Sequence, residues 1–211
     1  MAAVLPFIVM PGPLCGGTPA RYCEDMRLSV PFVQHAVTSA ALWLSLALPA
    51  PAQDREAELL AQLRAAETPH AAALVEREIE ALWSQSGSAA IDLLLRRGQD
   101  ALARGDWQAA IEHLTAAIDH DPTFAEAHAA RAAAYYQIGL AGPAIDDLRA
   151  ALTLNPNHWE AMKGLAVLLE EIGMRAEALE VWRRVTEINP QDAAAEMQAA
   201  RLALELEGRS L

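Results

Sequence analysis

The chain has 211 residues, with 16 Lys and Arg against 28 Asp and Glu, which gives a formal net charge of −12. This balance argues against nucleic acid as a partner, because phosphate binding needs clustered Lys and Arg, and Lys163 is the only lysine. Hydrophobic residues make up 53% of the chain, which is ample for a packed core. Much of that content is alanine, the residue with the highest intrinsic helix propensity, so we expect an all-α protein.

An apolar stretch from Ala36 to Leu48 precedes the small-residue triplet Ala50-Pro51-Ala52. The stretch is too short to cross a bilayer comfortably as a helix, and the triplet fits the cleavage pattern of a secretory signal. A start at Met26 gives a signal peptide of residues 26–52 with one arginine as its positive charge. Residues 1–25 are then an extension, mis-assigned or disordered, without periodicity.

The signal peptide predicts an exported protein, and the preference for Arg over Lys with abundant Ala favours a GC-rich bacterium, hence the periplasm. An uncleaved anchor on the inner membrane, facing the periplasm, is one alternative, and a disordered leader is another. Cleavage would make Gln53 the first mature residue. Both cysteines, Cys15 and Cys23, lie before Met26, so the mature chain would have no disulfide, no thiolate chemistry and no cysteine metal site.

Residues 53–88 are expected to form an N-terminal helical hairpin followed by a hinge. The two helices cover residues 55–66 and 69–84 and meet at Thr68-Pro69, whose threonine can cap the second helix. The hinge is Gln85-Ser86-Gly87-Ser88. The residues expected to give the hairpin its apolar side are Leu59, Leu63, Leu74, Ile79 and Leu82.

From residue 89 onward the sequence repeats every 34 residues. The recurring sets are Gly105, Gly139 and Gly173; Ala110, Ala144 and Ala178; Leu114, Leu148 and Trp182; Ala117, Ala151 and Val185; and Asp121-Pro122, Asn155-Pro156 and Asn189-Pro190. The apolar positions are spaced four and then three residues apart, which puts them on one face of a helix. Glycine suits the turn before that helix because a positive φ costs least there, and the Asx-Pro pair ends the unit. Each unit is therefore predicted to be a helix–turn–helix.

The 34-residue period and the small–large–small–proline pattern resemble the tetratricopeptide repeat (TPR). The resemblance implies an all-α, TPR-type α-solenoid of three helix-turn-helix repeats with an N-terminal helical hairpin and a C-terminal capping helix. The array spans residues 89–192, with repeats at about 91–124, 125–158 and 159–192. Arg97 and Arg131 depart from the family pattern, which usually has leucine at their position.

Residues 193–211 are expected to supply the capping helix and a tail, since the end of such an array needs a cover with a polar outer face. The residues of this helix that are expected to pack are Met197, Leu202, Leu204 and Leu206. An array of this size can also pack edge to edge, which allows a homodimer.

His113 and His120 suggest chemistry because they lie two helical turns apart on one face. A helical zinc site uses one-turn spacing, however, and no third ligand is evident. Neighbouring carboxylates such as Asp146-Asp147 point about 100° apart on a helix and are better explained as a solvated face. The sequence has no phosphate loop, nucleophile elbow or Ser/His/Asp arrangement, so we expect no catalytic residue, metal or cofactor. An enzyme or metal-binding protein that uses surface His, Asp and Glu is the alternative.

In TPR proteins the concave surface is lined by the first helix of each repeat and grips extended or helical peptides. The resemblance therefore implies candidate peptide-binding residues on that surface, namely Asp92, Leu95, Arg96, Gln99, Leu102, Glu126, Ala133, Tyr136, Gln137, Glu160, Lys163, Val167 and Glu170. Tyr136 with Leu95 and Val167 is the expected apolar anchor, since aromatic residues often dominate recognition.

TPR domains that bind chaperone tails clamp a terminal carboxylate with Lys, Arg and Asn. The matching positions here hold Leu95, Gln99, Ala130, Glu160 and Gly164, so that clamp is absent. Instead, Asp92, Glu126 and Glu160 recur 34 residues apart near the expected N-termini of the first helices. These acids either complement the helix dipoles, which we favour, or form an acidic rim for a basic peptide.

These patterns predict a scaffold or adaptor that binds a protein or peptide partner through the concave TPR surface, and the acidic charge mildly favours a basic partner. An envelope assembly or maturation factor that holds exported unfolded substrates is the alternative. The membrane would be involved only through an uncleaved signal segment.

Overall fold

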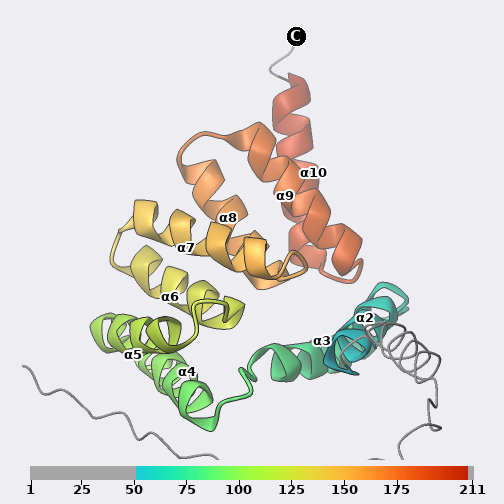
Figure 1. Cartoon of the computed structure of the whole chain (residues 1–211). Helices are drawn as coiled ribbons and strands as arrows, with labels where there is room; N and C mark the ends of the chain where they lie inside the picture. The colour runs from blue at the N-terminus through green and yellow to red at the C-terminus, as the bar shows by residue number, and fades with distance from the viewer. Residues whose placement is uncertain (1–50, 209–211) are drawn as a thin grey trace, which may run out of the picture. The chain divides into compact units, whose positions relative to one another are not determined.

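The computed structural model describes residues 51–208, and in this part of the chain every regular element is an α-helix (Figure 1). The helices are α2 (Pro51–Arg64), α3 (Pro69–Trp83), α4 (Ala89–Ala103), α5 (Trp107–His120), α6 (Ala125–Gln137), α7 (Ala141–Leu154), α8 (Trp159–Glu171), α9 (Arg175–Ile188) and α10 (Ala193–Gly208). The expected all-α fold class is confirmed. None of these helices is long and apolar enough to cross a membrane. The expected N-terminal extension, nearly all of the expected signal peptide and residues 209–211 lie outside the described residues.

The helices from α4 onward pair as the 34-residue repeat predicts. Helix α4 packs on α5, α6 on α7 and α8 on α9; each pair also contacts the next, and α10 packs on α9. The glycines between paired helices have positive φ, 75° at Gly105 and Gly139 and 85° at Gly173, which confirms the predicted turn. Ala110 and Ala144, at the recurring small position, are 0% exposed, so the paired helices meet there.

Side-chain caps fix where several helices begin. The Thr68 hydroxyl oxygen accepts the Ala71 N–H at 3.2 Å, as the sequence predicted, and the Asp106 carboxylate accepts the Ala109 N–H at 3.2 Å. A third cap was not predicted: the Nδ1 of His158 accepts the N–H of Ala161 at 3.3 Å and starts α8.

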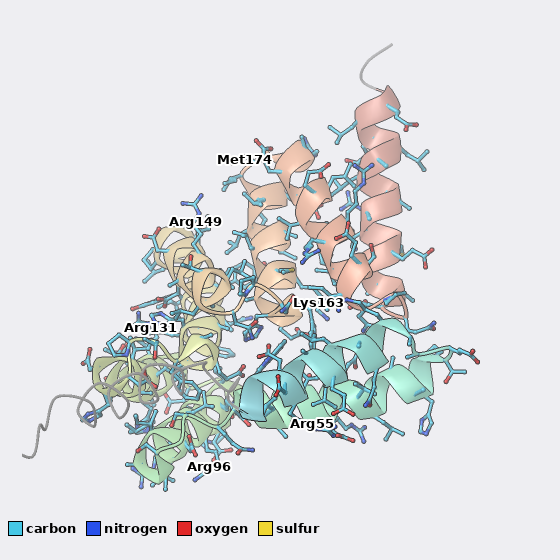
Figure 2. All side chains as sticks on the ribbon, turned by 45° about the vertical axis from the view of Figure 1, so that its right-hand side comes forward. Arg55, Arg96, Arg131, Arg149, Lys163 and Met174 are labelled. Carbon is cyan, nitrogen blue, oxygen red and sulfur yellow. The ribbon has the colours of Figure 1, made fainter. Side chains whose placement is uncertain are left out.

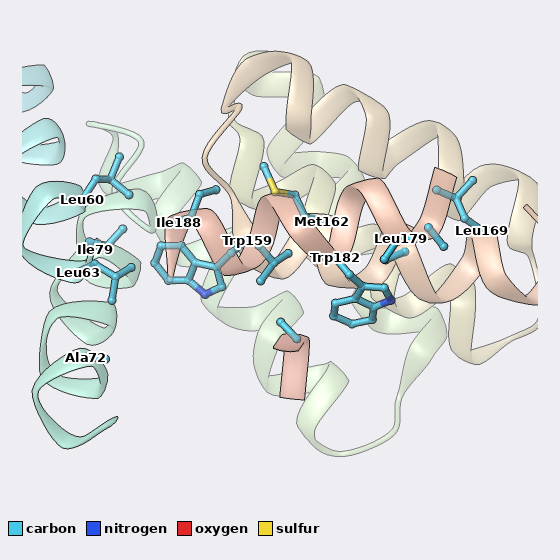
Figure 3. Close-up of a cluster of buried hydrophobic side chains, with 14 of the residues drawn as sticks. Leu60, Leu63, Ala72, Ile79, Trp159, Met162, Leu169, Leu179, Trp182 and Ile188 are labelled. Atoms are coloured by element: carbon cyan, nitrogen blue, oxygen red, sulfur yellow. The ribbon is translucent and has the colours of Figure 1, made fainter. Parts of the chain in front are cut away.

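The hairpin α2–α3 packs on the third repeat and the capping helix, although it precedes the first repeat in the sequence. Its buried residues Leu60, Leu63 and Ile79 belong to one apolar cluster with Trp159 and Ile188 (Figure 3). The cluster of the first repeat contains no buried hairpin residue. Polar contacts between residues more than 100 positions apart reinforce this docking: Asn189 Nδ2 donates to the Glu76 carboxylate, and Gln191 Nε2 donates to the Ala66 carbonyl at 3.0 Å.

Two of the apolar patterns proposed for the terminal elements were partly wrong. In α10, Met197 and Leu204 are 62% and 71% exposed, whereas Ala195 and Leu202 are fully buried. Residues 195 and 202 are seven apart and share a helix face, while 197 and 204 lie about 200° round from them. In the hairpin, Leu74 is half exposed, while Leu59, Leu63 and Ile79 are buried as expected, together with Leu60.

Arg131 forms a buried ion pair in place of the usual leucine. Its Nε and Nη2 donate to the two carboxylate oxygens of Asp147 at 2.7 and 2.8 Å, and its Nη1 donates to the Thr115 hydroxyl oxygen at 3.0 Å. The Nδ1 of His128 lies 3.3 Å from the same carboxylate. Burial acts to raise the pKa of Asp147, but the hydrogen bonds from Arg131 and His128 outweigh it and hold that pKa below its ordinary value.

The third repeat fills the same two positions with apolar residues, Leu165 and Val181, which lie 34 residues beyond Arg131 and Asp147. The helix pair can therefore be closed in two ways, by an ion pair or by an apolar contact. Replacing both charged partners by well-packed apolar residues is often neutral, whereas removing one leaves an uncompensated buried charge.

We predict that Arg131→Leu lowers the free energy of unfolding by about 3 kcal/mol, because it leaves the Asp147 carboxylate buried without its main partner. The double variant Arg131→Leu/Asp147→Val copies the third repeat and should return to within about 1 kcal/mol of the wild type. Urea denaturation followed by circular dichroism measures both values. Equal losses in the single and double variants would contradict this account.

Candidate peptide-binding groove

A groove of about 410 Å³ lies between α6 and α8, the first helices of the second and third repeats. The expected peptide-binding residues that line it are Glu126, Ala133, Tyr136, Glu160, Lys163 and Val167. The remaining lining residues are Ala129, Ala130, Ala132, Leu148, His158, Ala161, Gly164 and Leu168. The groove is thus apolar over most of its length, with charged side chains gathered near the N-terminal ends of α6 and α8.

Small residues on α6 and α8 create this groove. Ala129 and Ala133 are four apart on α6, and Gly164 faces them from α8, so no large side chain fills the space. A Cβ added at Gly164 would lie 3.3 Å from the Leu148 side chain, which forms part of the floor. The signal available in the sequence was the alanine-rich run of α6, but its partner helix could not be identified without the fold.

Tyr136 and Val167 are the exposed apolar residues of the groove, at 39% and 36%. The Tyr136 hydroxyl donates to Glu171 Oε1 at 2.6 Å, and this hydrogen bond, with some burial, raises the pKa of Tyr136 above its ordinary value. Leu95 does not join them, contrary to expectation. It is 1% exposed because it shares the buried face of α4 with Gly98 and packs in the core of the first repeat.

Glu126 occupies the junction of the three first helices. It accepts from Gln99 Nε2 of α4 at 3.4 Å, and the Nε2 of His158 donates to its other carboxylate oxygen at 3.1 Å. Because Nδ1 of His158 accepts the capping N–H of Ala161, the hydrogen-bond pattern assigns the proton of the neutral ring to Nε2. Glu126 is thereby held at the mouth of the groove.

Lys163 lies where α8 meets the hairpin (Figure 2), and its charge is already paired. Its Nζ is 2.6 Å from Glu160 Oε1 and donates to Asp192 Oδ2 at 3.2 Å. Burial acts to lower the pKa of Lys163, but the two carboxylates outweigh it, so the net shift is upward. The ammonium group therefore does little to offset the acidic character of this end.

Several expected site residues do not line this groove, namely Asp92, Leu95, Arg96, Gln99, Leu102, Gln137 and Glu170. Leu102 is half-buried against the core of the first repeat. Glu170 accepts from Trp182 Nε1 at 2.8 Å and from Arg201, so its carboxylate faces α9 and α10. The 34-residue register located these residues on first helices but could not give the direction of each side chain.

The histidines singled out in the sequence do not come together with further ligands. His113 is half-buried and His120 is exposed, both on α5. Within residues 51–208, no three His, Cys, Asp or Glu side chains gather where they could hold a metal ion.

Family models match most of the repeat array and the capping helix. One described as TPR repeat matches residues 98–139, and one described as Tetratricopeptide repeat matches residues 141–204. The chain belongs to the tetratricopeptide repeat family. No curated protein is similar enough to this TPR protein to count as a match.

Solved TPR structures share the fold of the array. The first TPR of Spaghetti (RPAP3), bound to the HSP90 peptide SRMEEVD, is 23% identical with a TM-score of 0.54, over 57% of this chain and 95% of that one. The TPR2B domain of yeast Sti1, in complex with pHsp70, is 22% identical with a TM-score of 0.51, over 56% and 99%. MamA is 27% identical with a TM-score of 0.52, over 57% and 69%.

Asp92, the first acid of the 34-residue column, differs from its counterparts in the later TPR repeats. Its Oδ1 accepts from the N–H of Ser86 at 2.8 Å and from the Ser86 hydroxyl at 2.6 Å, so the carboxylate holds the hinge before α4. These two hydrogen bonds lower the pKa of Asp92 below its ordinary 3.8. The Asp92 carboxylate therefore has a local structural role, and the interpretation as an acidic rim for a basic peptide does not describe it.

We predict that Asp92→Asn speeds amide hydrogen exchange at Ser86, because a neutral amide oxygen is a weaker acceptor than a carboxylate. Since the folded pKa is depressed, the carboxylate stabilises the hinge above pH 3.8 and this contribution fades as the pH falls through the lower folded value. Nuclear magnetic resonance of the Ser86 amide at neutral pH provides the measurement. An unchanged exchange rate would show that the hinge does not depend on this carboxylate.

Proposed function

We propose that this TPR protein is an adaptor that binds a segment of a partner protein in the groove between α6 and α8. The observation that carries the proposal is the groove itself, with an apolar floor of small residues and with Tyr136 and Val167 exposed. Solved structures of the same fold support it, since two of them hold chaperone peptides or are in complex with a chaperone. Exposed apolar side chains beside an open groove are typical of protein interaction sites.

The partner segment is expected to carry Lys or Arg with small apolar residues. Glu126 and Glu160 line the groove, the one lysine there is paired with carboxylates, and the whole chain carries −12. The HSP90 peptide SRMEEVD of the solved neighbour is acidic, and the basic clamp for a terminal carboxylate has no counterpart here. Electrostatic complementarity therefore favours a different and basic partner.

We also propose that the protein acts after export, in the bacterial periplasm. The support is the apolar stretch from Ala36 to Leu48 and the small-residue triplet that follows it. Leu59, Leu60 and Leu63, which α2 contributes to the core, all lie after the proposed cleavage site. N-terminal sequencing of the protein from its host should begin at Gln53, and a retained leader would refute cleavage.

Selection of a random heptapeptide library, displayed on phage, against the full chain tests the binding function without a known partner. Selected sequences should be rich in Lys or Arg and small apolar residues, and SRMEEVD should not compete with them. The absence of any enriched sequence, or enrichment of acidic sequences, would count against the proposal.

We predict that Ala133→Arg weakens binding of a selected heptapeptide at least about tenfold, or about 1.4 kcal/mol, because a long cation then fills the groove. Ala176→Arg is the matched control: it makes the same change at an exposed alanine on α9 that does not line the groove. Fluorescence anisotropy with the labelled peptide gives both affinities. Equal effects of the two variants would place binding elsewhere on the molecule.

A further inference from the structure

A second cavity, of about 390 Å³, lies under the hairpin, between α3 and the first helices of all three repeats. From the hairpin it is lined by Glu80 and Trp83, among others, and from the array by Gln99, Glu126 and Glu160. Glu126 and Glu160 also line the groove between α6 and α8, so the two spaces adjoin. Helix α3 therefore covers one end of the surface along which a bound peptide would run.

The Trp83 side chain attaches this end of the hairpin to the repeat array. Its ring centroid lies 4.6 Å from that of Trp159 and 5.0 Å from the His158 ring, on which it stacks. Its Nε1 donates to Glu56 Oε1 at 3.0 Å, which ties α3 to α2. This tilted contact with Trp159, at the start of α8, places the end of α3 beside Glu160, which lines the same cavity as Trp83.

The docked hairpin brings like charges together. Burial and then the carboxylates of Glu160, Glu76 and Glu126 raise the pKa of Glu80 above its ordinary value, and Lys163 acts in the opposite direction. Glu80 of α3 thus faces Glu126 and Glu160 of the array across the cavity. Arg77, which also lines the cavity, offsets only part of their repulsion, and this repulsion opposes the apolar contact at Trp83. A basic segment at the same place would be attracted by these three carboxylates, against one cation, Arg77, among the residues that line the cavity.

In the connection between α3 and α4, Asp92 holds Ser86, but Gly87 is not packed against the rest of the molecule. Gly87 has a φ of 84°, and a Cβ built on it would meet nothing within 4 Å. At the other end, the bonds of Glu76 to Asn189 and of Ala66 to Gln191 attach the hairpin to the loop after α9. Displacement of the end that carries Glu80 and Trp83 would therefore leave these far-end bonds in place.

We propose that the hairpin is an intramolecular competitor for the first-helix surface, and that a basic partner segment displaces the Glu80–Trp83 end of α3 to reach Glu126 and Glu160. The inference rests on the proposed function, because displacement requires a ligand of that surface. Competition couples docking of the hairpin to binding of the ligand. A change that weakens docking raises the affinity for the ligand, and a change that strengthens docking lowers that affinity.

Three variants of the full chain test this with a labelled basic heptapeptide from the random library. Trp83→Ala removes the stack on His158 and the tilted contact with Trp159, and it should raise the peptide affinity at least about fivefold. Glu80→Lys turns the repulsion into attraction and should lower the affinity by a similar factor. Glu67→Lys is the matched control, since it makes the same change of charge at an exposed residue of the hairpin that does not line the cavity.

Amide hydrogen exchange separates displacement from direct charge effects. Glu80→Lys should slow exchange at residues 79–83 before any peptide is added, and the peptide should speed exchange there in the wild type but not in α10. Circular dichroism checks that Trp83→Ala keeps its helices. If that variant does not fold, Glu80→Lys and the wild-type exchange still decide the matter.

The outcomes distinguish the two proposals. A peptide that binds with the same affinity to all variants and leaves exchange in α3 unchanged overturns the competition alone. If no library peptide binds either the wild type or Trp83→Ala, the proposed function fails and the competition fails with it.

Discussion

The close approach of the two helices within each repeat is the constraint on which the rest of this structure depends. It is set by one small residue of the first helix against one large residue of the second. In the first repeat a Cβ on Gly98 would lie 2.5 Å from Cγ of Leu114, so only glycine fits the observed spacing. The later repeats place Ala132 and Ala166 at the same position. Close pairing fixes the direction of each first helix, and the groove exists because α6 and α8 then face each other with small side chains.

Charge is used in this protein to tune contacts that packing has already defined. The ion pair of Arg131 and Asp147 closes the second repeat where leucine and valine close the third, so the fold tolerates either chemistry at that contact. Near the groove, charge acts through repulsion between carboxylates instead of attraction within an ion pair. Glu80, Glu126 and Glu160 line the cavity under the hairpin with one arginine, Arg77, and the nearby Lys163 is already paired with carboxylates, so negative charge is in excess there. Such an excess favours the basic partner segment proposed above, for which the apolar floor would supply contact area.

Much of the array could be predicted because its determinants are local and repeated. The glycine turns and the buried positions of α5, α7 and α9 each depend on residues within about one repeat, and the 34-residue period states them three times. Six of the expected groove residues were found in this way. The expectations that were wrong concern the direction in which a side chain points, which the 34-residue period does not give. Leu95 is buried although it matches a surface position of the family, and the carboxylates of Asp92 and Glu170 turn toward the hinge and the capping helix.

The sequence by itself determined that this chain is helical, where its helices turn and that they stack as TPR repeats, since short-range propensity and spacing are sufficient for those features. Only the tertiary structure decided where the hairpin α2–α3 docks. Its contacts join Glu76 to Asn189 and Ala66 to Gln191, residues 113 and 125 positions apart, and no repeat relates them. A contact of that kind depends on which apolar surface remains uncovered once the array has folded, and the third repeat and capping helix offer the surface that Leu60, Leu63 and Ile79 bury.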